Sequence, residues 1–470
     1  MIAPAGEWNR RQLLAGTGLG LYASAVVLTP GIAAKAILCA PLLLIPVFWS
    51  LLRTPSAWLA LFLGCALLTP PLPIALGDSG PHIALLVAGA GLWIGFLRSN
   101  EWQLRMDGLA LALIAVWTTF AFSLAMAAIY SGLAIAAASL ARVLLFGISV
   151  YVFLYVRDGP AHWGVQQSFR AVRWLYWAAA LSALFACVDF YFQFPAPAGY
   201  ERQFVWLASG VYRRAQGLFY EASTLGNLCA FFLEMIAVAL FRPKQDQPLS
   251  RGVMFAGGTV IAAALILSYS RASLINVAVA LVVLFCLNRS RIRWRRLAAG
   301  IAVFSAGAAG VLVGAFPVFA RAAWLRLAAA FEYFTESPNA VLSGRITSWQ
   351  TLAGFLAAHP WYALLGVGYK TLPYSDFIGT KAVGDNTYLT LLVETGIAGL
   401  FAVLALNGAI LLATYRASRS SDSLRSFCGT WMFCFWAGQC VQMLSADLLT
   451  YWRILPVYFF VLALAVRREA

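Results

Sequence analysis

The sequence predicts an all-α fold: a polytopic integral membrane helical bundle of about 12–14 transmembrane helices with a long helical loop on the outer side of the membrane. Of the 470 residues, 62% are hydrophobic and 11% are charged, so a water-soluble fold has no room to bury all the apolar side chains. The apolar residues gather into runs of about 17–25 residues, the length that crosses a membrane as a helix. Lys and Arg concentrate in alternate connections between these runs, which is the charge pattern of a multi-pass membrane protein.

About fourteen apolar runs have the length of a membrane-spanning helix. Their centres lie near residues 20, 42, 66, 90, 118, 145, 184, 229, 260, 280, 307, 400, 436 and 458. The expected domains are N-terminal transmembrane helices (1–195), central transmembrane helices with arginine-bearing outer connections (196–318), a large outer loop domain (319–386) and C-terminal transmembrane helices (387–470). The loop domain is long and rich in aromatic residues, which favours an ordered functional segment over disorder.

The basic residues predict which side of the membrane each connection faces, because Lys and Arg are retained in cytoplasmic loops. Taken in chain order, every second connection is basic, from Arg10 and Arg11 to Arg467 and Arg468. Both termini are therefore expected in the cytoplasm. This topology also explains the formal net charge of +15, so the charge does not indicate a nucleic-acid partner.

Motifs of metal, hydrolase or ATP-dependent chemistry do not occur in the sequence. All eight cysteines lie within apolar runs and form no CxxC pair, so we expect neither a disulfide framework nor a metal site. HExxH, GxSxG and P-loop motifs are also missing, which leaves metal-dependent hydrolysis, serine-hydrolase chemistry and ATP-driven transport without support.

A few basic residues fall on the side where the positive-inside rule does not require them. Outside the loop domain they are Lys35, Arg202, Arg213, Arg214, Arg271 and Arg453. Arg271 lies between two apolar runs, and an unpaired Arg at the bilayer centre costs about 2.5–3.5 kcal/mol on insertion. It is either an interfacial residue with Ser270 and Ser273 capping the turn, or a residue that holds an anion at the mouth of a cavity.

Arg345 also needs an explanation. It opens the predicted helix RITSWQTLAGFLAA, where a cation opposes the helix dipole. A bound anion would remove this penalty, because the helix N-terminal N–H groups and the guanidinium would then address one phosphate. The alternative is an ion pair with a loop carboxylate such as Glu332 or Glu336.

Few residues are candidates for acid–base chemistry. Glu221 lies at the start of a predicted helix, where a carboxylate also complements the helix dipole. His359 precedes Pro360, a position more typical of a turn residue than of a base. Arg142 and Asp189 lie within apolar runs, where pairing with interior groups is the simpler expectation.

Four segments of the chain resemble the O-antigen ligase and Wzy-type O-antigen polymerase superfamily of bacterial envelope glycosyltransferases. They are YRRAQGLFYEASTLGN, SYSRAS, GRITSWQTLAGFLAAHPWYALLGVGYKTLP and DNTYLTLLVETGIAGL, within residues 212–400. The resemblance implies glycan transfer from an undecaprenyl-diphosphate carrier to a glycan or lipid acceptor, at the periplasmic face of the bacterial inner membrane. It implies no cofactor and no obligatory metal. As partners it implies membrane lipids and a chain-length regulator or other polysaccharide-assembly proteins.

The resemblance also implies roles for individual residues. Arg213, Arg214, Arg271 and Arg345 are expected to hold the lipid-linked diphosphate, because arginine binds phosphate bidentately and is permanently charged. Asp385 or Glu221 is the expected base that removes the proton of the acceptor hydroxyl. Secondary candidates are His359, Asn386 and Tyr388.

The last segment departs from the ligase pattern. Ligases of this superfamily typically have a histidine before the Asn, whereas this chain has Asp385. Asp385 is either the base or the N-cap of the following helix. The departure favours a polysaccharide polymerase over a ligase that acts on the lipid A-core.

The sequence therefore predicts an inverting membrane glycosyltransferase that transfers or polymerises undecaprenyl-diphosphate-linked oligosaccharide. Transfer of polysaccharide to lipid A-core is the alternative reaction. A transporter or flippase for a lipid-linked glycan is the rival of another class. Transporters tend to have internal repeats and discontinuous helices at the membrane midplane. This sequence shows no repeat between its halves, and its unexplained polar residues gather on one side of the membrane.

Overall fold

The computed structural model describes residues 10–31, 45–72, 81–160, 163–196, 203–207, 210–289 and 344–467, with a few isolated residues besides. The chain forms two compact units, Met1–Trp58 and Leu59–Ala470. The first unit holds helix α1 (Arg10–Leu28) and a helix over Ile45–Arg53. Helix α3 (Pro55–Leu68) begins in the first unit and ends in the second.

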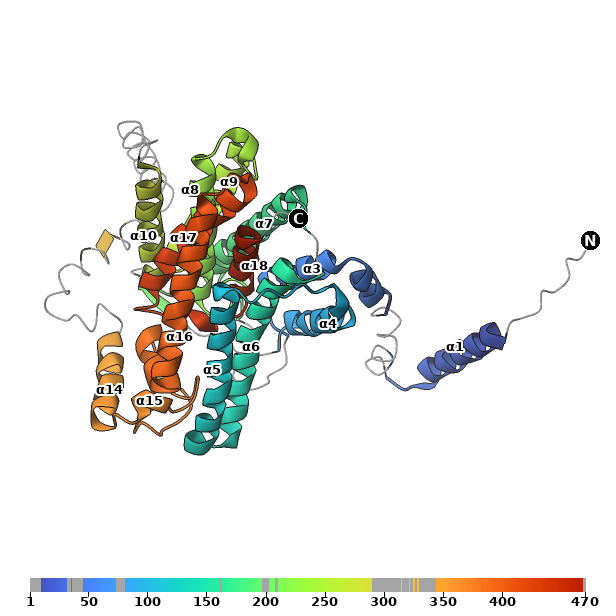
Figure 1. Cartoon of the computed structure of the whole chain (residues 1–470), viewed down its shortest axis with the longest axis horizontal. Coiled ribbons are helices and arrows are strands. Elements are labelled where there is room, and N and C mark those ends of the chain that lie inside the picture. Colours follow the sequence, from blue (N-terminus) through green and yellow to red (C-terminus); the bar gives the residue numbers. More distant parts are fainter. Residues whose placement is uncertain are drawn as a thin grey trace, which may run out of the picture. The chain divides into compact units, whose positions relative to one another are not determined.

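The second unit is a bundle of helices (Figure 1). They are α4 (Ile83–Leu97), α5 (Gly108–Ser131), α6 (Leu133–Asp158), α7 (Val165–Phe192), α8 (Ala222–Leu240), α9 (Arg251–Leu267), α10 (Arg271–Leu287), α14 (Arg345–Ala358), α15 (Tyr362–Leu365), α16 (Thr387–Ser418), α17 (Ser423–Gln442) and α18 (Leu455–Val466). Short 3-10 helices η1 (Ser99–Glu101), η2 (Lys244–Asp246) and η4 (Leu448–Thr450) lie in the connections. The described residues also form one antiparallel hairpin, in which β1 (Phe204–Leu207) pairs with β2 (Gly210–Arg213) and Phe204 lies opposite Arg213.

Length and hydropathy mark many of these helices as membrane-embedded. Among the described residues, α5, α6, α7, α8 and α16 are long and apolar enough to cross a membrane. The pair Ile45–Arg53 and α3 makes a sixth span if it counts as one. Of the expected helix centres, those near residues 42 and 307 lie outside the described residues, and the others fall within described helices. The predicted all-α, polytopic membrane fold is confirmed, while the four domain boundaries stay predictions.

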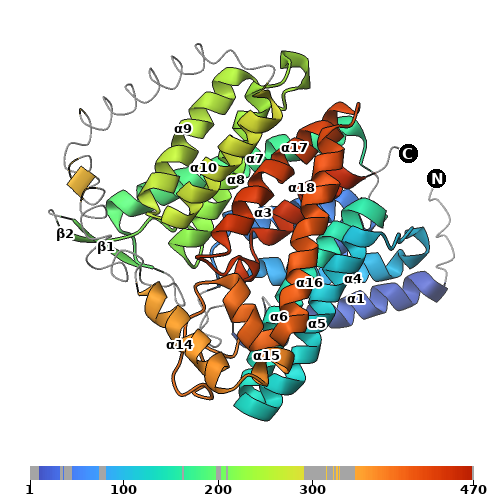
Figure 2. The ribbon, with the colours of Figure 1, turned by 60° about the vertical axis from the view of Figure 1, so that its left-hand side comes forward.

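The core of the bundle surrounds α17 and α18. Helix α17 packs against α8, α10, α16 and α18, and α18 packs against α6. Helices α5 and α6 form a hairpin beside α16 (Figure 2). Every residue of α18 from Leu455 to Ala465 is buried, which is the pattern of a helix surrounded by other helices.

Buried amide side chains join three of these helices inside the bundle. The Nδ2 atoms of Asn227 on α8 and Asn276 on α10 each donate to Gln439 Oε1 and Gln442 Oε1 of α17, at 2.6–2.9 Å. Tyr458 of α18 donates its hydroxyl to Asn227 Oδ1 at 2.6 Å. Because a polar group in a membrane interior needs a partner, these bonds fix the register of the helices. We call Asn227, Asn276, Gln439 and Gln442 the amide network.

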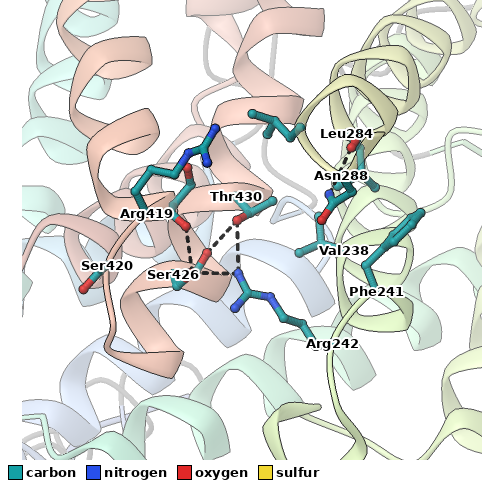
Figure 3. A pocket seen from close by; sticks show the side chains of 11 residues that line it. Val238, Phe241, Arg242, Leu284, Asn288, Arg419, Ser420, Ser426 and Thr430 are labelled. Atoms are coloured by element: carbon teal, nitrogen blue, oxygen red, sulfur yellow. Dashed lines mark hydrogen bonds between the residues drawn. The ribbon is translucent and has the colours of Figure 1, made fainter. Parts of the chain in front are cut away.

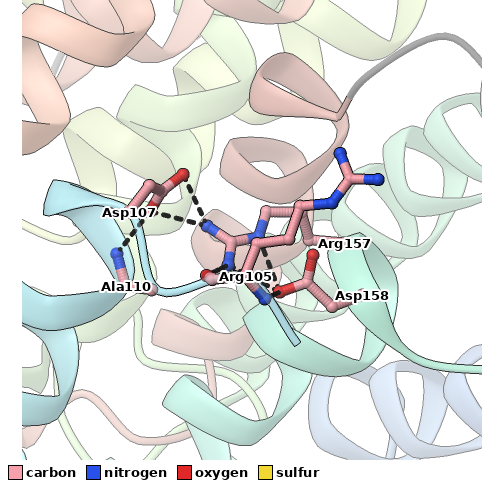
Figure 4. A network of polar contacts seen from close by, with 5 residues as sticks. All are labelled: Arg105, Asp107, Ala110, Arg157 and Asp158. Carbon is pink, nitrogen blue, oxygen red and sulfur yellow. Dashed lines mark hydrogen bonds and ion pairs between the residues drawn. The ribbon is translucent and has the colours of Figure 1, made fainter. Parts of the chain in front are cut away.

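Arginine side chains tie the helices together at one end of the bundle. Arg242, which follows α8, donates from Nη2 to Ser426 Oγ at 2.8 Å and to Thr430 Oγ1 at 3.2 Å on α17 (Figure 3). Arg157 at the end of α6 contacts both oxygens of Asp107 at 2.9 and 3.0 Å, and Asp158 at 2.5 Å (Figure 4). Asp107 also caps α5 by accepting from Ala110 N. The sequence assigned these basic residues to topology alone, and the structure adds a packing role.

The Arg157 contacts predict a large stability effect. The Arg157 and Asp158 side chains are only 5% and 4% exposed, so Arg157→Ala leaves a buried carboxylate without its partner. Loss of one partner of a buried ion pair costs about 3–5 kcal/mol. We expect the thermal unfolding midpoint of the purified protein in detergent to fall markedly. Arg98→Ala is the control, because its pair with Glu101 is 26% and 34% exposed and is expected to matter little. Equal midpoints for the two variants would contradict this assignment.

Candidate functional site

A cavity of about 730 Å³ lies at the end of the bundle where α8, α10 and α16 begin and α17 ends. It gathers five of the residues singled out in the sequence. They are Arg214, Arg271, Arg345, Glu221 and Asp385. These residues come from four separate stretches of the chain, so their meeting in one cavity is a result of tertiary structure. We call this the upper cavity.

Arg213 and Arg214 are adjacent in sequence but have different surroundings. Arg213 ends β2, and its Nη2 donates to Asp189 Oδ1 of α7 at 2.7 Å. Arg214 lines the upper cavity, and its Nε donates to Ser268 O at 2.7 Å. Consecutive residues of an extended chain point to opposite sides, which explains the difference. The structure therefore does not bring Arg213 into the cavity lining, and Asp189 has the interior partner expected for it.

Arg271 is the first residue of α10, and a serine turn precedes it. Ser270 is the N-cap, and its hydroxyl accepts from Ser273 N and contacts Ser273 Oγ at 2.8 Å. The capping serines and the cavity position of Arg271 thus occur together, so the two sequence interpretations are not exclusive. Gly226 of α8 lies against this turn, since a Cβ there would meet Ser270 Cβ at 2.8 Å. The glycine lets α8 approach α10 at the cavity.

Arg345 and Asp385 form an ion pair in the lining of the upper cavity. Arg345 Nε lies 3.7 Å from Asp385 Oδ2, and the side chains are 24% and 36% exposed. Burial raises the pKa of the Asp385 carboxyl above its ordinary value, and the charge of Arg345 partly opposes the rise. Glu332 and Glu336, the partners considered for Arg345, lie outside the described residues. The carboxylate that Arg345 meets in the structure is the candidate base itself.

The N-cap of α16 is Asn386, whose Oδ1 accepts from Leu389 N at 3.1 Å. The alternative interpretation, in which Asp385 caps this helix, is therefore wrong. Glu221 precedes α8, yet it makes no side-chain cap and instead accepts from Ser223 Oγ at 2.8 Å. Both candidate bases thus line the cavity, and although Glu221 is the N-cap residue of α8, its side chain makes no cap hydrogen bond.

The other secondary candidates lie outside the cavity lining. His359 is exposed at the end of α14, with its ring 5.4 Å from that of Phe355. Tyr388 donates its hydroxyl to Cys440 O at 3.0 Å. Their contacts, like the cap made by Asn386, are those of structural residues.

The upper cavity also contains charged residues that sequence analysis missed or ranked low. Lys370 pairs with Asp447, in the connection after α17. Burial lowers the pKa of Lys370, against the opposing charge of Glu394. Arg142 of α6 lies over the Tyr374 ring at 4.5 Å, and its Nη2 donates to the Tyr374 hydroxyl at 2.5 Å. The sequence signal for Arg142 was its charge within an apolar run.

The loop that carries Lys370 is anchored on a kink in α16. Gly396 has φ 70° inside this helix, and the helix carbonyls of Val393 and Glu394 accept from Val367 N at 2.9 Å and Gly368 N at 2.8 Å. A Cβ on Gly396 would meet Leu364 O at 2.3 Å, so the close approach requires glycine. Broken helix hydrogen bonds at membrane depth need such replacement partners. The kink thereby holds in place the loop that contributes Lys370 to the lining of the upper cavity.

The charges of the described lining favour an anionic ligand. Five lining residues are basic, namely Arg142, Arg214, Arg271, Arg345 and Lys370. Three are acidic, namely Glu221, Asp385 and Asp447, which leaves a formal excess of two positive charges. Such a site can hold a doubly charged phosphate group and still provide a carboxylate that accepts a proton. Within the described residues there is no cluster of three His, Cys, Asp or Glu side chains that would hold a metal ion.

Part of the chain is similar to a known protein family. No curated protein matches the chain. Residues 256–404 match a protein-family model described as O-antigen ligase. The matched segment contains Arg271, Arg345, Lys370 and Asp385, whereas Arg214 and Glu221 precede it. The match confirms the resemblance of the sequence segments to the O-antigen ligase and polymerase superfamily: residues 256–404 of this membrane protein are similar to an O-antigen ligase domain.

Proposed function

We propose that the protein is an inverting glycosyltransferase that transfers or polymerises undecaprenyl-diphosphate-linked oligosaccharide at the periplasmic face of the bacterial inner membrane. The observation that carries the proposal is the upper cavity, in which three arginines and two candidate bases share one lining within and beside a domain of this superfamily. The helix ends around the cavity are those assigned to the periplasm by the positive-inside rule. With the site on that face, both termini are cytoplasmic.

The arginines would hold the diphosphate of the donor. Arg214, Arg271 and Arg345 present planar, permanently charged donors, which suit phosphate oxygens better than a lysine does. Arg271 also lies at the N-terminus of α10, where free N–H groups favour an anion. These donors would stabilise the negative charge that develops on the diphosphate as the glycosidic bond breaks.

The reaction then needs a base and a nucleophile. The acceptor hydroxyl attacks the anomeric carbon opposite the diphosphate, the new glycosidic bond forms, and undecaprenyl diphosphate leaves with the bonding electron pair. Attack from the opposite side inverts the anomeric configuration. Asp385 takes the hydroxyl proton, and its raised pKa makes it a stronger base than an exposed aspartate. Glu221 is the second candidate for this role.

A polymerase and a ligase of this kind differ in the acceptor that receives the glycan. Asp385 replaces the histidine typical of ligases, so we infer a polysaccharide polymerase, with a growing glycan as acceptor and a chain-length regulator or other polysaccharide-assembly proteins as partners. Transfer to lipid A-core is the alternative. The proposed mechanism uses the protein's own side chains, without cofactor or metal.

We expect Arg271→Ala and Arg345→Ala each to lower the rate of glycan transfer by about 10²–10³-fold, because each removes a charged donor from the leaving group. The measurement uses the purified protein reconstituted with undecaprenyl-diphosphate-linked repeat units, with product length read by gel and mass spectrometry. Lys381→Ala is the matched control, since Lys381 is exposed in the same loop region and does not line the cavity.

Full product from both arginine variants would contradict the diphosphate assignment. A protein that moves repeat units between leaflets without lengthening them would instead be a flippase, which a leaflet-accessibility assay in the same vesicles detects.

Asp385→Asn is expected to lower kcat by about 10²–10⁴-fold, because the amide cannot accept a proton. In the unchanged protein, kcat/KM should rise with pH as Asp385 ionises, and its raised pKa places this rise above the ordinary aspartate range. The variant should lose this pH dependence. Asp376→Asn, a change to an exposed carboxylate of the same loop, is the control. If Glu221→Gln abolished the pH dependence and Asp385→Asn kept it, Glu221 would be the base.

A further inference from the structure

A second cavity, of about 430 Å³, lies at the opposite end of the same helices, where α8, α10 and α16 end and α17 begins. We call it the lower cavity. Figure 3 shows Arg242 and Arg419 reaching it from the ends of two different helices, α8 and α16. The described residues that line it include these two arginines and no Asp or Glu, so its formal charge is positive.

Hydroxyl groups hold the first arginine in place. Arg242 donates to Ser426 Oγ and Thr430 Oγ1, and these two side chains are only 6% and 7% exposed. The hydroxyls donate in turn to backbone carbonyls, Ser426 to Ser418 O at 2.8 Å and Thr430 to Ser426 O at 2.7 Å. Because both hydroxyl protons are used in this way, their lone pairs accept from Arg242 and orient its guanidinium.

The second arginine is the C-cap residue of α16. Arg419 is exposed, with its guanidinium 5.3 Å from the Tyr415 ring centre and 3.4 Å from the Tyr415 hydroxyl. It forms no ion pair with any described residue. A cation at a helix C-terminus complements the helix dipole, which accounts for each arginine separately. It does not account for a shared cavity that two arginines and a row of hydroxyls enclose.

Besides Asn288, Ser418 and Ser420, the rest of the lining is apolar. Val238, Phe241, Leu284 and Leu287 come from the last turns of α8 and α10. The lower cavity therefore joins a larger polar wall, cationic and rich in hydroxyls, to a smaller apolar wall. This is the combination that a phosphate group attached to a hydrocarbon chain requires.

We propose that the lower cavity binds the phosphodiester headgroup of a membrane phospholipid, with Arg242 and Arg419 on the phosphate and an acyl chain along the apolar wall. Its position at the ends of apolar helices suits the headgroup region of a membrane. In the sequence, α10 is followed by RSRIRWRR at 289–296, a cluster of the kind that anionic lipid surfaces attract. The shared chemistry is a phosphate group, and the apolar wall favours the lipid over free phosphate.

The test is lipid binding to the full-length protein, purified in detergent and stripped of lipid, followed by native mass spectrometry. We expect phosphatidylglycerol to bind, and the double variant Arg242→Gln/Arg419→Gln to weaken its binding at least tenfold, as expected for loss of charge-assisted hydrogen bonds. Arg416→Gln is the matched control, because Arg416 is exposed one turn earlier on α16 and does not line the cavity. Leu287→Trp, which fills the apolar wall and keeps both arginines, should also weaken binding.

Two further arms distinguish the sources of the phosphate. Diacylglycerol, which has the chains but no phosphate, should not bind, and inorganic phosphate should not compete with phosphatidylglycerol. Unchanged phosphatidylglycerol binding in the double variant, or equal binding of diacylglycerol, would overturn the proposal. Competition by inorganic phosphate at millimolar concentration would overturn the lipid assignment in favour of free phosphate. The readout is binding, so it is independent of whether glycan transfer at the upper cavity is established.

Discussion

The amide network is the constraint on which both cavities depend. Polar side chains buried among apolar helices need partners, and the Nδ2 atoms of Asn227 and Asn276 reach Gln439 and Gln442 only when α8, α10 and α17 keep one register. Gln442 belongs to the network and also lines the upper cavity. Gln442 therefore connects the hydrogen bonds between the helices to the lining of the upper cavity. From the same helices, the opposite ends form the lower cavity.

Arginine has three different uses in this membrane protein. Arg453 is 2% exposed and donates to the carbonyls of Ala66 and Thr69 at 2.8 Å, so it provides hydrogen-bond donors for carbonyls at the C-terminal end of α3. Arg213 neutralises Asp189 within the bundle. Arg271 lines the upper cavity, next to the serines that cap α10. A charge that topology does not explain thus indicates a specific contact, and the geometry of its surroundings decides whether that contact is structural or a binding site.

The two cavities share a chemical principle but differ in composition. The upper cavity combines basic residues with carboxylates, which suits a reaction that needs both a bound anion and a proton acceptor. The described lining of the lower cavity has arginines and hydroxyls without carboxylates, which suits binding alone. A phosphate group bound in each cavity would give the arginines at both ends of the bundle an anionic partner.

By itself, the sequence determined the all-α membrane fold, because hydropathy and charge placement act locally along the chain. It also identified Arg271, Arg345, Glu221 and Asp385, whose charge between apolar runs or at helix starts is visible without a structure. Only the tertiary structure decided that Arg214 and not Arg213 lines the cavity, that Asn386 caps α16, and that Lys370 meets Asp447. The first and last of these outcomes depend on the direction of side chains along an extended segment and on contacts between distant segments, and the cap depends on the residue at which α16 begins. Periodicity and spacing do not encode these features.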